Sequence, residues 1–115
     1  MTVVKAIVIE AGNPEVKIIE QLDASLESMQ AIVGGWLEAV PLTPNIILWI
    51  NEEGKMMDLE PNFALTTPNG KALDIIVGNV VITGVDIAGN TSSLSDSDIL
   101  MIQDHFINRV TLKMF

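Results

Sequence analysis

The chain has 115 residues and no cysteine, and its fifteen acidic and six basic residues give a formal net charge of −9. Without cysteine, disulfides, thiolate metal ligands and thiol catalysis are excluded. Only 18% of the residues are charged while 49% are hydrophobic, so the acidity reflects a shortage of lysine and arginine. This balance argues against direct binding to nucleic acid or to an anionic membrane, because phosphate contact needs cations.

Composition and length also predict the oligomeric state, the number of domains and the location of the protein. High apolar content with few charges predicts surface buried against a second copy, and therefore a homo-oligomer. The length fits a single domain over residues 1–115. The first ten residues read as a charged strand without a cleavage pattern, and no apolar run approaches the ~20 residues of a membrane helix. We therefore expect a cytoplasmic protein without a membrane partner.

The first third of the chain predicts a hairpin followed by a helix. Residues 2–10 and 15–20 read as two strands joined by a turn at 11–14. Asp23 or Ser25 can cap the helix, and Gly34-Gly35 ends it. Its predicted buried face lies across the hairpin and carries Leu22, Leu26, Met29 and Val33.

The most hydrophobic run, residues 46–50, predicts the central strand, buried on both faces. A strand over 36–42 should precede it. Asn51 opens a turn in which Gly54 can take the left-handed conformation, and this turn should close a hairpin with a strand over 55–59. The core of the sheet is thus expected around this hairpin.

The second half predicts further antiparallel strands and a second helix. Residues 61–65 read as a short irregular or single-turn segment, and the turns at 67–70 and 86–89 share one pattern. Strands are expected at 72–77 and 80–86, and Gly78-Asn79 between them could form a tight turn or a kink that favours one longer strand.

The last helix should start at Ser95, which forms a capping box with Asp98. Its buried stripe is predicted at Ile99, Ile102, Phe106 and Val110, and residues 111–115 form an apolar tail. The predicted fold class is α+β: a bent antiparallel sheet of five to seven strands with two helices, one after the first hairpin and one near the C-terminus.

The polar side chains give no sign of catalysis. No nucleophile elbow, kinase set or dinucleotide fingerprint is present, and the single histidine, His105, reads as a solvated helix residue. Neither a catalytic residue, a cofactor nor a metal site is therefore predicted, and we expect a protein that is not an enzyme. The candidate binding residues are Asn51, Glu52 and Glu53 in the turn, Asn62, Asp74 within an apolar run, and the two tryptophans Trp36 and Trp49.

Short motifs spread over nearly the whole chain resemble a known family. They are the strand Val-Lys-Ala-Ile-Val-Ile-Glu, the Val-Gly-Gly helix end, the Asn-Glu-Glu-Gly-Lys turn, Asp-Ile-Ile-Val-Gly, Thr-Gly-Val-Asp and Leu-Ser-Asp. The resemblance is to a small domain of unknown function carried by bacteriophages, plasmids and conjugative elements, sometimes with antirestriction proteins. It implies a mobile-element setting and, for a phage-encoded protein, the host cytoplasm.

Two functions follow as hypotheses. The first is a non-enzymatic phage or mobile-element protein that binds and blocks a host protein, such as a basic, nucleic-acid-handling defence factor. The alternative is a protein that sequesters a nucleotide signal in a pocket between subunits. An anionic nucleotide needs local cations, for which the sequence offers Lys55, Lys71 and Arg109.

Overall fold

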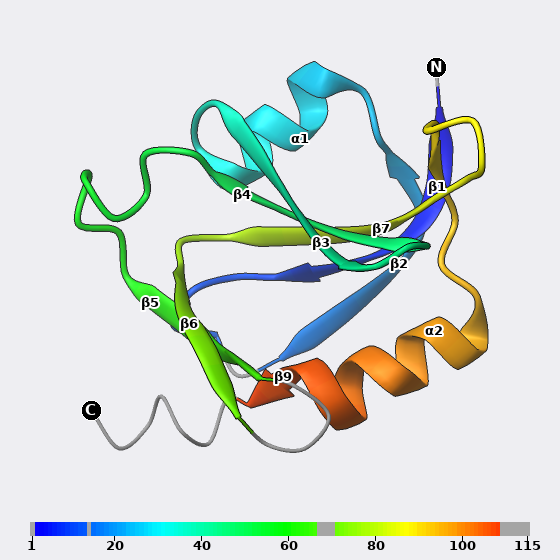
Figure 1. The fold of residues 1–115 in the computed structure, drawn as a ribbon. Helices are drawn as coiled ribbons and strands as arrows, with labels where there is room; N and C mark the ends of the chain where they lie inside the picture. The colour runs from blue at the N-terminus through cyan, green and yellow to red at the C-terminus, as the bar shows by residue number, and fades with distance from the viewer. Residues whose placement is uncertain (1, 14, 67–70, 109–115) are drawn as a thin grey trace.

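The computed structural model describes residues 2–13, 15–66 and 71–108, and shows two antiparallel sheets with helices on both faces of the larger one (Figure 1). The elements, in chain order, are β1 Val3–Ile9, β2 Val16–Asp23, α1 Leu26–Val33, β3 Leu37–Thr43, β4 Ile46–Asn51, β5 Pro61–Thr66, β6 Ala72–Val77, β7 Val80–Val85, β8 Thr91–Ser92, α2 Asp96–Met101, the π-helix η1 Ile102–Phe106 and β9 Ile107–Asn108. The predicted α+β class, antiparallel pairing and two helices are confirmed.

The larger sheet is built around β7. Its strand order is β2-β1-β7-β4-β3, with β8 also paired to β7. The β1–β2 and β3–β4 hairpins therefore flank β7, and residues Val80 to Gly84 are all buried. The prediction that 46–50 forms the centre is wrong: β4 lies one strand away, and Ile47, Trp49 and Ile50 remain partly exposed.

The smaller sheet has the order β6-β5-β9 and lies below the larger one in Figure 1. Two predictions fail here. Residues 61–65 are not irregular, since they belong to β5, whose Phe63 and Ala64 are almost completely buried. Residues 55–59 form no strand, because both edges of β4 are already paired, with β3 and with β7.

Each face of the larger sheet has its own apolar layer. On the α1 side, Met29 and Val33 pack with Val4, Ala6, Val8 and Val81. On the other side, Ile99 and Ile102 pack with Ile7 and Ile82 of the larger sheet. Phe63 of the smaller sheet belongs to the same layer. Burial of these side chains provides the main stabilisation that holds the two sheets and helices together.

The helix ends follow the predicted caps. The Ser25 hydroxyl accepts from the Ser28 N–H, and Gly34 ends α1 in the left-handed conformation. Ser95 and Asp98 form the predicted capping box of α2. Two residues depart from the predicted stripe: Leu26 is exposed in the first turn of α1, and Leu22 belongs to β2. The Phe106 side chain, Val110, the 67–70 turn and the 111–115 tail lie outside the residues that can be described.

Gly78 and Asn79 carry the chain from the smaller sheet into the larger one. Gly78 has φ +76°, which a residue without a side chain adopts readily. The Asn79 side chain accepts from the Ala11 N–H at 3.0 Å and donates to the Ile32 carbonyl at 3.1 Å. The bend is therefore neither a hairpin turn nor a kink within one strand, because β6 and β7 belong to different sheets.

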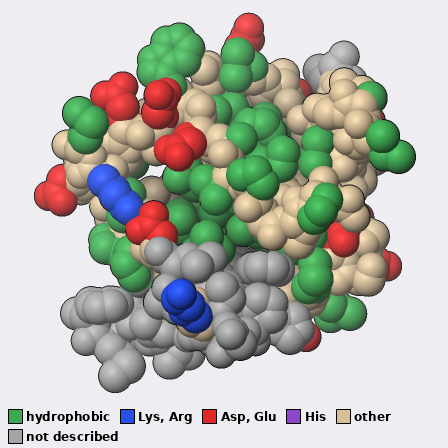
Figure 2. Space-filling model, in the orientation of Figure 1, with side chains coloured by type: hydrophobic (Ala, Val, Ile, Leu, Met, Phe, Trp, Pro, Cys, Tyr) green, Lys and Arg blue, Asp and Glu red, His purple; other side chains and the backbone are tan. Residues whose placement is uncertain are grey.

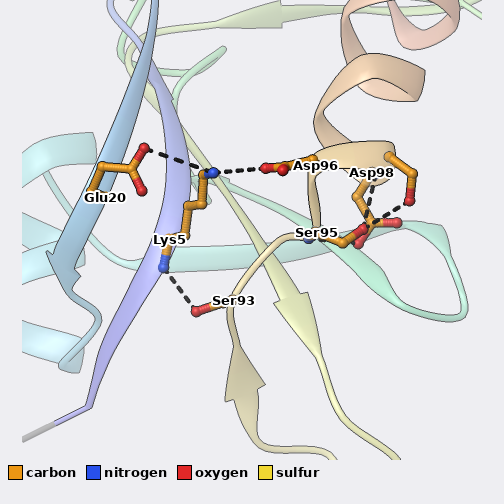
Figure 3. A network of polar contacts seen from close by, with 7 residues as sticks. Lys5, Glu20, Ser93, Ser95, Asp96 and Asp98 are labelled. Atoms are coloured by element: carbon orange, nitrogen blue, oxygen red, sulfur yellow. Dashed lines mark hydrogen bonds and ion pairs between the residues drawn. The ribbon is translucent and has the colours of Figure 1, made fainter.

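A polar network ties α2 to the first strand (Figure 3). Lys5 Nζ lies 2.8 Å from an Asp96 carboxylate oxygen and 3.7 Å from one of Glu20. The Lys5 main-chain N–H donates to Ser93 Oγ. The hydrogen bond and charge of Asp96 raise the pKa of Lys5, and those of Lys5 lower the pKa of Asp96. The network thus fixes the start of α2 against β1.

Candidate functional site

A pocket of about 420 Å³ lies where the two sheets meet. Its walls come from β3 and β4 on one side and from β5 and β6 on the other, with the 52–58 turn beside them. The lining residues are Glu38, Val40, Ile50, Asn51, Glu52, Lys55, Met56, Leu65, Asp74, Ile75, Ile76 and Val77. The pocket thus joins residues that the sequence separates by almost forty positions.

Strand alternation explains the β3 wall. Side chains two residues apart on a strand share a face, so Glu38 stands beside Val40, which packs against the apolar layer between the sheets. The intervening Ala39 faces the other way. The apolar residue therefore forms part of the pocket floor, and the carboxylate stands closer to solvent.

The turn beside the pocket is fixed by close packing. The Gly54 N–H donates to the Asn51 carbonyl at 3.1 Å. A Cβ at Gly54 would lie 2.9 Å from Val77 Cγ2, so glycine is needed for close approach to β6. The predicted left-handed conformation is absent at Gly54 and found instead at Asp58, whose φ is 55°.

One lysine reaches across the pocket edge. Lys55 Nζ lies 2.6 Å from Asp74 Oδ1, and this oxygen also accepts from the Ile75 N–H at 2.7 Å. Both side chains are at least half exposed. Asp74 is therefore exposed and paired with a lysine, although it stands within an apolar run of the sequence.

The pocket combines an apolar floor with an acidic edge. Among its lining residues, the carboxylates are Glu38, Glu52 and Asp74, and the only ammonium group is that of Lys55. Figure 2 shows hydrophobic side chains in the middle of this face and acidic side chains gathered to their upper left. The Lys55 charge is compensated by Asp74, so the remaining field is negative.

Three of the seven predicted binding residues, Asn51, Glu52 and Asp74, line this pocket. Glu53 is exposed in the same turn but does not line it. Asn51 is buried: its side chain donates to the Val33 carbonyl at 3.2 Å and accepts from the Glu53 N–H at 2.8 Å. Its amide therefore shapes the turn.

The remaining predicted residues lie elsewhere. Asn62 is buried and donates to the carbonyls of Ile9 and Gly78 at 2.9 and 2.8 Å, which joins the two sheets. Trp49 packs in the layer under α1 and donates to Thr83 Oγ1 at 2.9 Å.

Trp36 is different, because 66% of its surface is exposed and its carbonyl accepts from the Glu52 N–H at 2.8 Å. It therefore stands next to the acidic edge.

Glu38 and Met56 also line the pocket but were not among the predicted binding residues, because no local pattern distinguishes them. The strand that contains Glu38 and Val40 was predicted. Glu38 lies near β6 only because the chain forms a second sheet, and that sheet was not predicted. Within the described residues no cluster of three or more histidine, aspartate or glutamate side chains could hold a metal ion. Likewise, none of the described helices has the length and apolar character of a membrane span.

Fold and site together define an α+β domain with an apolar, acidic-edged pocket between two sheets. A family model, Domain of unknown function (DUF3846), matches residues 4–107, and the chain belongs to this family. This agrees with the resemblance to a small domain family of unknown function. No curated protein and no solved structure matches the chain.

Proposed function

We propose that this protein is a non-enzymatic binding protein whose pocket captures a basic and partly apolar segment of a partner protein. The observation that carries the proposal is the pairing of an apolar floor with an acidic edge. An aliphatic side chain of the partner would fill the space over Val40 and Ile76, and neighbouring arginines or lysines would meet Glu38 and Glu52.

Trp36 supports this reading. Tryptophan is the side chain most enriched among residues that dominate binding energy, and here it is largely exposed beside Glu52. Its aromatic face can also attract an arginine or lysine of the partner. Partner contacts would then extend from the pocket over the edge to Trp36.

The charge of the pocket does not favour the alternative, a nucleotide signal. A nucleotide brings phosphate groups, whereas the lining offers three carboxylates and one lysine that is already paired with Asp74. Binding a phosphate there would require that pair to break. A basic protein, such as a nucleic-acid-handling defence factor of a bacterial host, carries positive charge that the pocket carboxylates attract. The mobile-element setting of this proposal rests on the resemblance described above.

The test measures binding of a fluorescent peptide with one leucine between arginines, by fluorescence anisotropy. The Glu52→Lys and Glu38→Lys variants should each weaken binding about tenfold, equivalent to about 1.4 kcal/mol. Raising the salt concentration should weaken wild-type binding as well, because exposed charges are screened.

The matched control is Glu27→Lys, which makes the same charge change in α1 on the other side of the larger sheet. It should leave binding nearly unchanged. If Glu27→Lys weakened binding equally, the effect would be due to the net charge of the protein and not to the pocket. Equal binding of a peptide in which glutamates replace the arginines would contradict the proposal. Native mass spectrometry after incubation with bacterial lysate then separates the hypotheses, since a retained small molecule would support the nucleotide alternative.

A further inference from the structure

Strand β2 forms one edge of the larger sheet. It has eight residues and pairs only with β1, and no other described strand lies along its outer side. An outer strand of this length presents a row of N–H and C=O groups that can pair with another strand. The edge is therefore a potential interface.

The pairing pattern tells which main-chain groups point outward. The Lys5 N–H and C=O both bond to the segment that follows β8, on the side of β1 away from β2. Main-chain groups alternate in direction along an antiparallel strand, so those of Ala6 and Val8 point toward β2. In β2, Ala6 pairs with Ile19 and Val8 pairs with Lys17, which are the two neighbours of Ile18. The Ile18 N–H and C=O must therefore point outward.

Ile18 also places apolar surface at this edge. Its side chain is 44% exposed, and it lines a groove of about 380 Å³ between β2 and α2. Ile99 and Leu100 of α2 line the same groove, and Leu100 is 61% exposed. Pairing along β2 would thus cover apolar side chains as well as main-chain groups.

Lysines offset part of the negative charge at this edge. Lys17 forms an ion pair with Glu10, and Lys5 forms ion pairs with Glu20 and Asp96. Two copies that each carry a formal net charge of −9 repel one another. Contact through an edge where Glu10, Glu20 and Asp96 are paired with lysines of the same copy limits this repulsion, which favours a second copy as the occupant.

We propose that two copies of the chain form a dimer by antiparallel pairing of their β2 strands about a two-fold axis at Ile18. In this register Ile18 lies opposite Ile18 of the second copy, Lys17 lies opposite Ile19, and Val16 lies opposite Glu20. The larger sheet then continues from one copy into the other. A contact that repeats under a two-fold axis closes on itself and stops at two copies.

Cysteine cross-linking of the full chain tests the register, because the chain contains no cysteine of its own. Opposed Cα atoms in an antiparallel pair lie about 5.5 Å apart, within the range of a disulfide. Ile18→Cys should therefore form a covalent dimer under mild oxidation. Glu20→Cys should not, because its two copies would be about 13 Å apart along the strands. Ile87→Cys, in a fully exposed turn, measures background from collisions.

Sedimentation across a range of protein concentrations gives the second test. The wild type should be dimeric, and Ile18→Lys should raise the dimer dissociation constant at least about tenfold by placing two lysines opposite each other. Ile87→Lys is the matched control and should leave the dimer intact, while circular dichroism checks that both variants fold. A monomeric wild type, a dimer unaffected by Ile18→Lys, or equal cross-linking at positions 18, 20 and 87 would overturn the proposal.

Discussion

The buried polar side chains and the two carboxylates Glu38 and Glu52 at the pocket edge differ in whether their hydrogen bonds are already used within the chain. Asn51, Asn62 and Thr83 are buried, and each bonds to a main-chain or side-chain group. No buried side-chain nitrogen or oxygen among the described residues lacks a partner. Glu38 and Glu52, by contrast, stand exposed to solvent at the pocket edge.

The difference shows that a polar residue next to apolar sequence is a poor guide to ligand binding. Burial of an amide is costly unless the folded chain satisfies it, so the buried asparagines hold turns and sheets in place. Carboxylates at the edge have no such task, and their bonding capacity remains available to a ligand. Substitutions should therefore separate into those that change stability and those that change binding.

The largest effect is expected for Asn62→Ala. The change removes the two hydrogen bonds that the Asn62 amide donates to the buried carbonyls of Ile9 and Gly78. We expect the free energy of unfolding to fall by about 2–4 kcal/mol, measured by urea denaturation. Asn90→Ala, in an exposed turn, is the control and should change it by less than about 0.5 kcal/mol. Similar small losses in both variants would contradict the structural role of Asn62.

A smaller effect is expected at the Trp49–Thr83 hydrogen bond. Trp49→Phe retains an aromatic ring under α1 but removes the N–H that bonds to the buried Thr83 hydroxyl. The free energy of unfolding should fall by about 1–2 kcal/mol. Combining it with Thr83→Val in a double-mutant cycle should give a coupling of at least about 0.5 kcal/mol. A coupling near zero would mean that this interior pair does not depend on its hydrogen bond.

The smallest effect is expected for exposed charge pairs, and pH measures it. Lys5 lowers the pKa of Asp96 below the ordinary aspartate value of about 3.9. A carboxyl whose pKa is lower in the folded state stabilises that state above its unfolded pKa, and the benefit disappears as pH falls through the folded pKa. Asp96→Asn should therefore lower the urea midpoint slightly at pH 7 and by less at pH 2. A difference of the same size at both pH values would exclude the ion pair as its cause.

Local signals in the sequence predicted much of the fold. The caps at Ser25, Gly34 and Ser95 depend on residues within a few positions, and each was confirmed. The failures concern long-range pairing. Residues 55–59 could not pair with β4 because β7, which begins only at Val80, occupies that edge.

The same limit applied to the site. Lys55 and Asp74 were singled out separately, yet their contact depends on the turn packing against β6. Glu38 was missed because an alternating strand identifies a face but not what lies opposite. Trp36 lies just before β3 and Trp49 lies within β4, so local sequence does not distinguish the two tryptophans. Tertiary packing leaves Trp36 exposed and Trp49 partly buried.

The place of β7 also sets the order in which the protein can assemble during synthesis. A ribosome completes the β1–β2 and β3–β4 hairpins well before residues 80–85 emerge, yet these hairpins meet only through β7. Before β7 is available, the apolar faces of β1, β2, β3 and β4 cannot be buried in a common sheet. The chain between β1 and β7 forms a long loop, whose closure costs conformational entropy. Nascent chains halted before residue 80 should therefore bind chaperones and resist compaction, and folding should begin abruptly once the seventh strand has left the exit tunnel.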